Sequence, residues 1–204
     1  MGFDIERHDY GTGGYPAQLV LQDVLTLHGR QFRDAALIVA SPPCQEFSYM
    51  AMPWSRAKAK RAAILADPAE RKRLTALFDA CFRIQREAIE AAGHFIPLVV
   101  ENVRGANEWV GRSRWNFGSF HLWGDVPALM PMTKKAVKVG GDGFFENGSE
   151  WMIARGGPHS TARKAASAAI AKIPFALARH IAKTWKPDPT WIAANITDLL
   201  CAEE

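Results

Sequence analysis

The sequence has little that would assign it to a membrane-bound, secreted or metal-binding class. No apolar run approaches the roughly 18 residues that a membrane-spanning helix needs. No basic segment followed by a long apolar one marks a secretory signal. The cysteines are few, odd in number and far apart, and no Cys-x-x-Cys pair indicates a disulfide framework or a zinc site. These absences favour a cytoplasmic protein with no membrane partner and no metal.

The composition is that of an ordinary folded protein. The chain has 204 residues, of which 48% are hydrophobic, so it can bury a core as one domain or one domain with a small appendage. The formal net charge is +4 and the sequence pI is about 9.1. This mildly basic balance is compatible with a nucleic-acid partner, although many unrelated soluble proteins share it.

Short apolar runs alternate with a long helical pattern in the first half of the chain. One helix is expected from Pro68 to Ala92, where apolar residues recur at helical spacing and Gly93 follows as a stop. The run from Ala36 to Ala40 is continuously apolar, which is typical of a strand buried on both faces. The expected strands are Phe3 to Ile5, Gln18 to Val24, Ala36 to Ala40 and Pro97 to Val100. Strand, helix and strand in this order predict an α/β fold with a parallel sheet.

The second half is less regular. Gly105 to Gly148, rich in tryptophan and glycine, is interpreted as loops and short strands, and Glu150 to Ala154 as a strand. A helix is expected to start near Pro174 and to end before Pro187.

Two short motifs each follow a predicted buried strand. Ser41 to Gln45 reads Ser-Pro-Pro-Cys-Gln, and Val99 to Val103 reads Val-Val-Glu-Asn-Val. In an open parallel sheet, ligands bind beyond the carboxyl ends of the strands. If the two strands are neighbours, Cys44 and Glu101 lie at the same edge of the sheet and face one crevice.

In sequence, order and spacing, these segments resemble two signature motifs of the DNA cytosine-5 methyltransferases, in particular the short phage-type and bacterial members. The resemblance implies a Rossmann-like S-adenosylmethionine-dependent methyltransferase fold with a mostly parallel sheet, here N-terminally truncated. It also implies a catalytic core over residues 1–104, a small target-recognition region over 105–150, and a C-terminal strand and helices over 151–204 that complete the core. The biological role (restriction, phage protection or regulation) stays open.

The resemblance assigns catalytic roles to four residues. A Cys44 thiolate would add to carbon 6 of cytosine, which makes carbon 5 reactive towards a methyl donor. Glu101 would donate a proton or hydrogen bond to ring nitrogen 3, and Asn102 would order the cysteine loop. Arg155 is the first candidate for an arginine that supports the ring, with Arg163 second. The other cysteines, Cys81 and Cys201, are interpreted as small buried hydrophobes.

The methyl donor of the family is S-adenosylmethionine. Acidic residues at strand ends hold its ribose hydroxyls and adenine, and the matching positions are Asp4, with Glu6 second, and Asp23. Pro42 is placed beside the cofactor. The family's opening strand and glycine-rich turn have no counterpart, since Gly11 to Gly14 follows the wrong strand and is interpreted as a flexible turn. The expected first unit therefore lies upstream, or a partner segment or chain supplies it, or this form binds cofactor poorly.

The expected partner is double-stranded DNA with the target cytosine flipped out of the stack. The segment from Phe47 to Arg61 carries basic and aromatic residues that suit phosphates and the gap left by a flipped base. Further basic residues lie in the predicted recognition region: Arg112, Arg114, Lys134, Lys135 and Lys138. Two alternatives stay open: a catalytically silent or split DNA-binding relative, and a methyltransferase acting on a free pyrimidine nucleotide.

Overall fold

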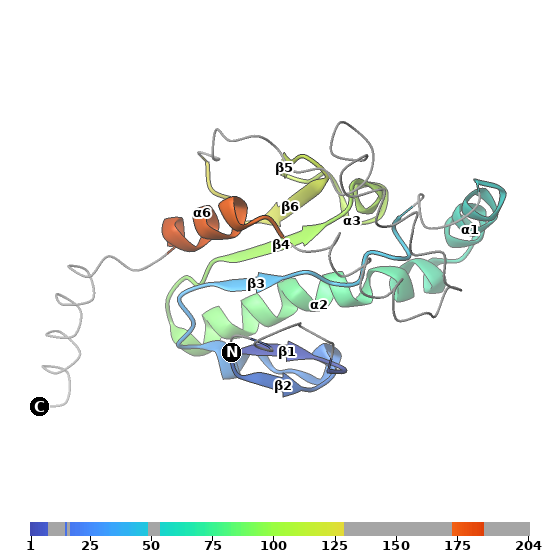
Figure 1. The fold of residues 1–204 in the computed structure, drawn as a ribbon. Coiled ribbons are helices and arrows are strands. Elements are labelled where there is room, and N and C mark those ends of the chain that lie inside the picture. The colour runs from blue at the N-terminus through green and yellow to red at the C-terminus, as the bar shows by residue number, and fades with distance from the viewer. Residues whose placement is uncertain (8–14, 16, 49–53, 129–172, 186–204) are drawn as a thin grey trace, which may run out of the picture.

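Two small sheets lie beside one long helix in the computed structural model of the chain (Figure 1). The structure describes residues 1–7, 15, 17–48, 54–128 and 173–185. The predicted strand over Glu150 to Ala154 and the residues Arg155, Arg163 and Cys201 lie outside this part of the chain, as does the glycine-rich turn of Gly11 to Gly14.

The strands form a pair and a sheet of four. Strands β1 (Gly2–Asp4) and β2 (Leu19–Leu21) are parallel. The larger sheet has the order β3-β4-β6-β5, with bounds Ile38–Ala40 for β3, Leu98–Asn102 for β4, Trp115–Phe117 for β5 and Phe120–Gly124 for β6. Strands β3 and β4 are parallel, whereas β6 is antiparallel to both β4 and β5. The fold is therefore mixed α/β.

The expected predominance of parallel pairing is not found among the described strands. Two of the four strand pairs are antiparallel, because β5 and β6 form a hairpin that pairs with β4. Gly118 lies in the hairpin turn with φ 61°, a left-handed conformation that glycine adopts without steric cost.

The long predicted helix is confirmed as α2 (Pro68–Ala92). Asp67 caps it by accepting a hydrogen bond from the Ala69 amide at 2.8 Å, and Gly93 ends it in the left-handed conformation with φ 70°. The expected C-terminal helix is α6 (Phe175–Trp185). Among the residues that the structure describes, the other helical segments are α1 (Trp54–Ala66), α3 (Asn107–Val110) and the 3-10 turns η1 (Val24–Thr26), η2 (Gly29–Phe32) and η4 (Arg104–Ala106).

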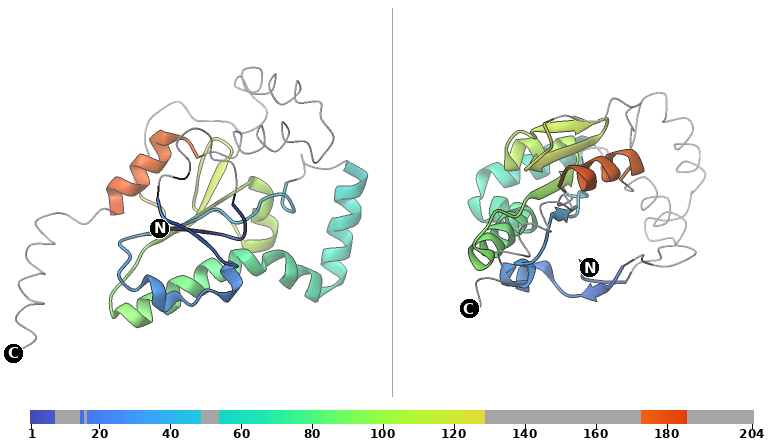
Figure 2. Two further views of the ribbon diagram at one scale, coloured as in Figure 1. Left: turned by 60° about the horizontal axis from the view of Figure 1, so that its bottom comes forward. Right: turned by 90° about the vertical axis from the view of Figure 1, so that its left-hand side faces the viewer.

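The four-stranded sheet has an apolar cluster on each face. Along β4, Leu98 and Val100 belong to a cluster with residues of α2, whereas Val99 belongs to a second cluster with Leu177 of α6. Figure 2 shows α2 and α6 on opposite sides of the sheet. This alternation of side chains along a strand buries both faces, and all five residues of β4 are buried.

The β1–β2 pair is attached to α2 through the turns that follow β2. The Arg83 guanidinium donates to the Leu27 carbonyl at 2.9 Å, and the Gly29 amide donates to the Glu87 carboxylate at 2.6 Å. Gly29 is pressed against the helix, since a Cβ there would lie 2.2 Å from the Ile84 carbonyl oxygen. Both sheets therefore share α2 as their support.

The expectation that Ala36 to Ala40 forms a strand buried on both faces is wrong, since the strand covers only Ile38–Ala40 and both Ala36 and Val39 are exposed. Ile38 and Ala40 pack against the α2 cluster, but Val39 is 65% exposed. The reason lies in the topology: β3 is an edge strand of its sheet, so no neighbouring strand continues that face beyond it.

Candidate functional site

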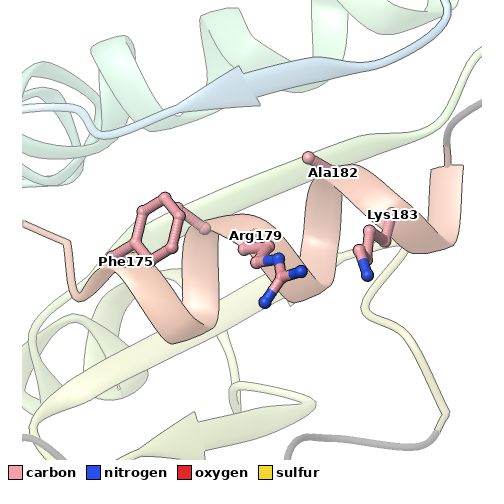
Figure 3. Close-up of a pocket in the computed structure, with 5 residues that line it drawn as sticks. Phe175, Arg179, Ala182 and Lys183 are labelled. Carbon is pink, nitrogen blue, oxygen red and sulfur yellow. The ribbon is translucent and has the colours of Figure 1, made fainter.

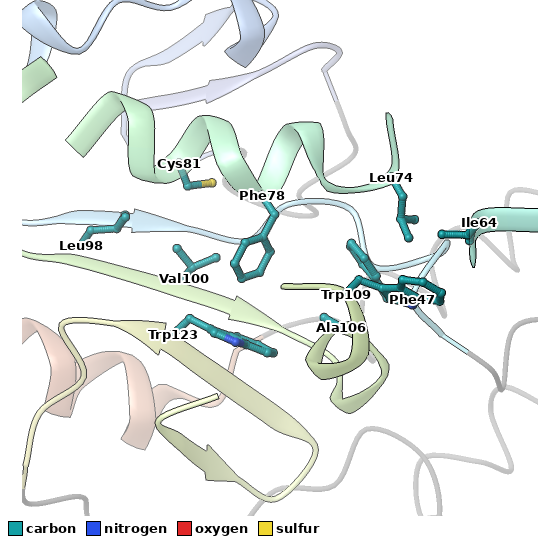
Figure 4. Packing of buried hydrophobic residues seen from close by; sticks show 10 residues of the cluster. All are labelled: Phe47, Ile64, Leu74, Phe78, Cys81, Leu98, Val100, Ala106, Trp109 and Trp123. Carbon is teal, nitrogen blue, oxygen red and sulfur yellow. The ribbon is translucent and has the colours of Figure 1, made fainter. Parts of the chain in front are cut away.

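Cys44 lies on a tight turn just beyond the carboxyl end of β3. Its carbonyl accepts hydrogen bonds from the Phe47 and Ser48 amides, both at 3.0 Å. The Phe47 side chain, 3% exposed, enters the core cluster that also holds Ile64 and Trp109 (Figure 4). Cys44 itself is half-buried and is not a member of either apolar cluster. The turn thus anchors its phenylalanine in the core and leaves the thiol outside it.

Glu46 ties the same turn to two helices. Its carboxylate lies 3.2 Å from a guanidinium nitrogen of Arg73 on α2 and 3.6 Å from the ammonium of Lys60 on α1. Partial burial raises the pKa of Glu46, but the Arg73 hydrogen bond and the Lys60 charge outweigh it, and the pKa is lowered overall. The carboxylate is therefore stable in its charged form, and its two ion pairs connect the Cys44 turn to α1 and α2.

Strand β4 ends in two buried polar residues, Glu101 and Asn102, with exposures of 6% and 0%. The Ser41 hydroxyl donates to the Glu101 carboxylate at 2.6 Å, and the Asn102 amide donates to the Pro42 carbonyl at 3.0 Å. Two hydrogen bonds therefore join the end of β4 to the segment that leads into Cys44. The expected contact from Asn102 to the cysteine loop is confirmed, whereas its part in catalysis stays a prediction.

Cys81 provides a contrast within the same chain. It lies on α2 in the apolar cluster with 6% exposure, and its thiol is 3.3 Å from the Leu77 carbonyl (Figure 4). Burial raises the pKa of Cys81 to about 11. The interpretation of Cys81 as a buried structural residue is confirmed.

The acidic residues predicted to bind cofactor lie at or just after the strand ends of the other sheet. Asp4, at the end of β1, accepts hydrogen bonds through one carboxylate oxygen from the Ile5 amide at 2.7 Å and the Glu6 amide at 3.3 Å. Asp23, just after β2, accepts from the Leu25 amide at 2.9 Å. Glu6 is exposed. In Figure 1 strands β2, β3 and β4 run in the same direction, so these acids and the Cys44 turn lie beyond carboxyl ends on the same side.

Sequence reasoning did not assign roles to Ser41 and Glu46. The strand register is the signal that would have identified Ser41. Because Ala40 is paired with Val100 in the parallel ladder, the next residues along the two strands are Ser41 and Glu101. A sequence alone does not give that register. Glu46 could be found only from the placement of α1 and α2, since its partners lie far along the chain.

Helix α1 carries a concentration of positive charge. It holds four basic residues and no acidic one. Lys60 and Arg61 are paired with Glu46 and Glu108. The exposed Trp54 ring, by contrast, lies beneath the Lys58 ammonium at 5.4 Å. This surface combines positively charged side chains with an exposed aromatic ring. Such a surface suits a negatively charged polymer whose own aromatic rings can stack on the indole.

A shallow pocket of about 350 Å³ lies on α6 (Figure 3). All of its lining residues belong to that helix: Phe175, Ala178, Arg179, Ala182 and Lys183. No predicted site residue lines it, so it carries no argument for the Cys44 site.

The sequence matches no protein-family model, no curated protein and no solved structure. The proposed family therefore depends on the motifs and the geometry above. Within the described ranges, no helix is long and apolar enough to cross a membrane. The same residues contain no group of three or more histidine, cysteine, aspartate or glutamate side chains arranged to hold a metal ion.

Proposed function

We propose that this chain transfers a methyl group from S-adenosylmethionine to carbon 5 of cytosine in double-stranded DNA through a covalent Cys44 adduct. One observation carries the proposal. The segment that leads into the turn of the half-buried Cys44 is hydrogen-bonded, through Ser41 and Pro42, to the end of the adjacent strand, where Glu101 and Asn102 lie. A nucleophile and a carboxyl group held near the ends of adjacent strands are the groups that addition to a pyrimidine ring needs.

The chemistry starts with the Cys44 thiolate, which forms a bond to carbon 6 of the ring. The electron pair displaced from the ring's 5,6 double bond makes carbon 5 nucleophilic, and negative charge reaches nitrogen 3. Glu101 stabilises that charge by a proton or hydrogen bond at nitrogen 3. After carbon 5 has taken the methyl group, it loses its proton to water, the bond to sulfur breaks, and the thiolate leaves with its electron pair.

The cofactor would supply an electrophilic methyl group. Asp4 and Asp23 fit its ribose and adenine parts, because each carboxylate is held at a strand end by a backbone amide through one oxygen. No residue described here offers the glycine-rich turn expected for the methionine part. The fit is thus to one half of the cofactor.

Helix α1 supports DNA as the partner. Arg56 and Lys58 are exposed, and Trp54 is 68% exposed on a helix that follows the Cys44 turn closely in sequence. Lysine and arginine contacts to phosphates provide most of the non-specific affinity for DNA. An indole ring can stack on a base or fill the space that a flipped base leaves.

A split or catalytically silent DNA-binding relative is the second candidate. It is favoured by the separation of the two sheets, since β1 and β3 share no ladder. In that case Asp4 and Asp23 would be joined to the Cys44 side only by way of α2, and the chain alone would bind cofactor weakly.

The decisive experiment uses duplex DNA that carries 5-fluorocytosine, with S-adenosylmethionine present. Fluorine cannot leave as a proton does, so the sulfur adduct persists and is detected on a denaturing gel. We expect the adduct with the wild-type chain and with Cys81→Ser, and none with Cys44→Ser, which should still bind DNA. An adduct on Cys44→Ser would exclude this mechanism.

A second readout needs no methyl donor. Addition of Cys44 makes carbon 5 able to exchange its hydrogen with water, so tritium is released from DNA labelled at that carbon. Release without methyl transfer would indicate an intact cysteine site with an incomplete cofactor site. A complete absence of both would favour the catalytically silent relative.

A further inference from the structure

Helix α6 has two faces with different surroundings. Leu177 and Ile181, on one face, are 0% and 6% exposed and belong to the apolar cluster on the sheet. Phe175, Ala178 and Ala182 follow one another at intervals of three and four residues, so they share another face. That face is open, since Phe175 is 78% exposed and both alanines are exposed. An exposed phenyl ring that adjoins other exposed apolar residues is typical of an interaction surface.

The two alanines leave a hollow along this outer face. Its volume is about 350 Å³, and among the described residues its lining consists of α6 residues alone (Figure 3). A hollow in the surface of one helix, where small residues lie one turn apart between larger ones, is the shape that receives a side chain of a second helix. The outer face of α6 therefore offers one half of a helix–helix contact.

The same helix carries positive charge and no negative charge. From Phe175 to Trp185 it contains Arg179 and Lys183, both exposed, and neither aspartate nor glutamate. Both cations border the hollow. Their aliphatic stems can pack on an apolar neighbour, while their charged ends attract acidic groups. A segment that fits this face is therefore helical, apolar on one side and acidic in net charge.

The sequence that follows α6 has these properties. After Lys-Pro-Asp-Pro at 186–189, residues 190–204 read Thr-Trp-Ile-Ala-Ala-Asn-Ile-Thr-Asp-Leu-Leu-Cys-Ala-Glu-Glu. Ile192, Ile196 and Leu199 recur at helical spacing, which predicts an amphipathic helix. All charged residues of the stretch are acidic: Asp198, Glu203 and Glu204. The stretch lies outside the described part of the chain, so this helix is a prediction from the sequence.

The short connection favours an antiparallel pair of helices. Helices joined by about two to eight residues are usually antiparallel neighbours, and here four residues with two prolines separate them. Counting equal numbers of residues in both directions from the connection places Ile192 near Ala182. The same count places Ile196 near Ala178. Two large apolar side chains therefore fall where α6 has two small ones.

We propose that residues 190–204 form a helix that packs antiparallel on the outer face of α6, with Ile192 and Ile196 in the hollow over its alanines. This helix covers the exposed Phe175 ring, and its acidic residues face the cations that border the hollow. The proposal goes beyond methyl transfer and does not depend on it.

A pair of introduced cysteines tests the geometry in the full-length chain. Ala178→Cys/Ile196→Cys is combined with Cys44→Ser and Cys201→Ser, so that the buried Cys81 is the remaining native thiol. A disulfide requires the two Cα atoms to lie within about 7 Å. Because the proposed contact brings these positions together, we expect the disulfide to form within one chain under mild oxidation.

The matched control pairs Ala178→Cys with Thr197→Cys in the same background. Residue 197 lies about 100° further round the predicted helix than residue 196, so its disulfide should form at least tenfold more slowly. Mass spectrometry of proteolytic peptides identifies the linked residues, and a non-reducing gel separates links within a chain from links between chains. Equal rates for the two pairs would overturn the proposal. Links formed only between chains would also overturn it, since a second copy would then cover α6.

Hydrogen exchange provides a second test in a chain with its native cysteines. Isolated helices shorter than about 12–15 residues are marginal in water, so the amides from Ile196 to Leu200 should exchange slowly only if the helix is packed. Ala182→Glu fills the hollow and places a negative charge against an acidic segment, so it should speed their exchange at least tenfold. Thr184→Glu, at an exposed residue on nearly the opposite side of α6, should not.

Two exchange results would contradict the packing of residues 190–204 on α6. One is fast exchange of the Ile196 to Leu200 amides in the wild-type chain. The other is an equal effect of Ala182→Glu and Thr184→Glu. Neither cofactor nor DNA takes part in these experiments, so their outcome is independent of the proposed activity.

Discussion

The Ser41 hydroxyl donates a hydrogen bond of 2.6 Å to the buried Glu101 carboxylate. The two residues come from the ends of adjacent parallel strands, so this bond connects the segment before Cys44 to the end of β4. It gives the buried carboxyl group one defined partner and fixes its orientation relative to the cysteine turn. A hydrogen bond inside a protein contributes about 0.5–1.5 kcal/mol net, and leaving a buried acceptor without its donor costs about 1–3 kcal/mol.

Replacing Ser41 by alanine should therefore affect both stability and catalysis. We expect Ser41→Ala to lower the free energy of unfolding by about 1–2 kcal/mol, measured by urea denaturation, because a buried acceptor loses a donor. In a single-turnover methylation assay the rate should fall about tenfold, which corresponds to about 1.4 kcal/mol. Ser41→Thr retains the hydroxyl and should keep most of the activity. A wild-type rate in Ser41→Ala would show that the bond does not position Glu101.

The thiols of Cys44 and Cys81 should differ strongly in reactivity. At pH 8, a thiol with a pKa of about 11 is ionised in only about one molecule in a thousand, and Cys81 is also buried. Iodoacetamide should therefore modify Cys44 in the folded chain and leave Cys81 unmodified, as measured by mass spectrometry of the peptides. Unfolding in urea before labelling is the control, since both should then react. Equal labelling of the two in the folded chain would contradict the structure.

Much of the scaffold could be predicted because its signals are local. Helix α2 has apolar residues at helical spacing, an aspartate cap and a glycine stop, and its bounds agree with the prediction. The strands ending near Cys44 and Glu101 are short apolar runs bounded by polar or proline residues. Their parallel pairing follows from the helix between them, because a crossover connection of that length returns the chain in the same direction.

What could not be predicted depends on contacts between distant segments. The exposure of Val39 follows from the absence of a neighbouring strand, which its own apolar sequence does not reveal. The antiparallel β6 lies in a stretch interpreted as loops and short strands, and only its pairing with β4 makes it part of the sheet. The contact between Ser41 and Glu101 requires the register of two strands that are 60 residues apart at this point.

The Glu87 carboxylate should make stability depend on pH. A hydrogen bond from the Gly29 amide, followed by one from Arg83, lowers the pKa of Glu87 below its usual value of 4.5. A carboxyl group with a lowered pKa in the folded state stabilises the fold above the unfolded pKa, and this contribution is lost as the pH falls through the folded pKa.

Glu87→Gln should therefore unfold at a lower urea concentration than the wild-type chain at pH 7. The difference should shrink as the pH falls below 4.5, where the wild-type carboxyl group becomes neutral. Glu90→Gln, on the same helix, is the control and should show no comparable pH dependence. A difference between Glu87→Gln and the wild-type chain that is constant from pH 7 to pH 3 would show that the charge of Glu87 does not stabilise the attachment of the β1–β2 pair to α2.

The basic residues of α1 should determine how DNA binding depends on salt. Each phosphate contact contributes about 0.9 to the slope of log affinity against log salt concentration, so the double variant Arg56→Gln/Lys58→Gln should reduce that slope by about 2. Lys60 and Arg61 already pair with Glu46 and Glu108, so the matched variant Lys60→Gln/Arg61→Gln should change the slope less. Fluorescence anisotropy of a labelled duplex at several salt concentrations measures both. Equal slopes for the two double variants and the wild-type chain would show that DNA does not contact α1.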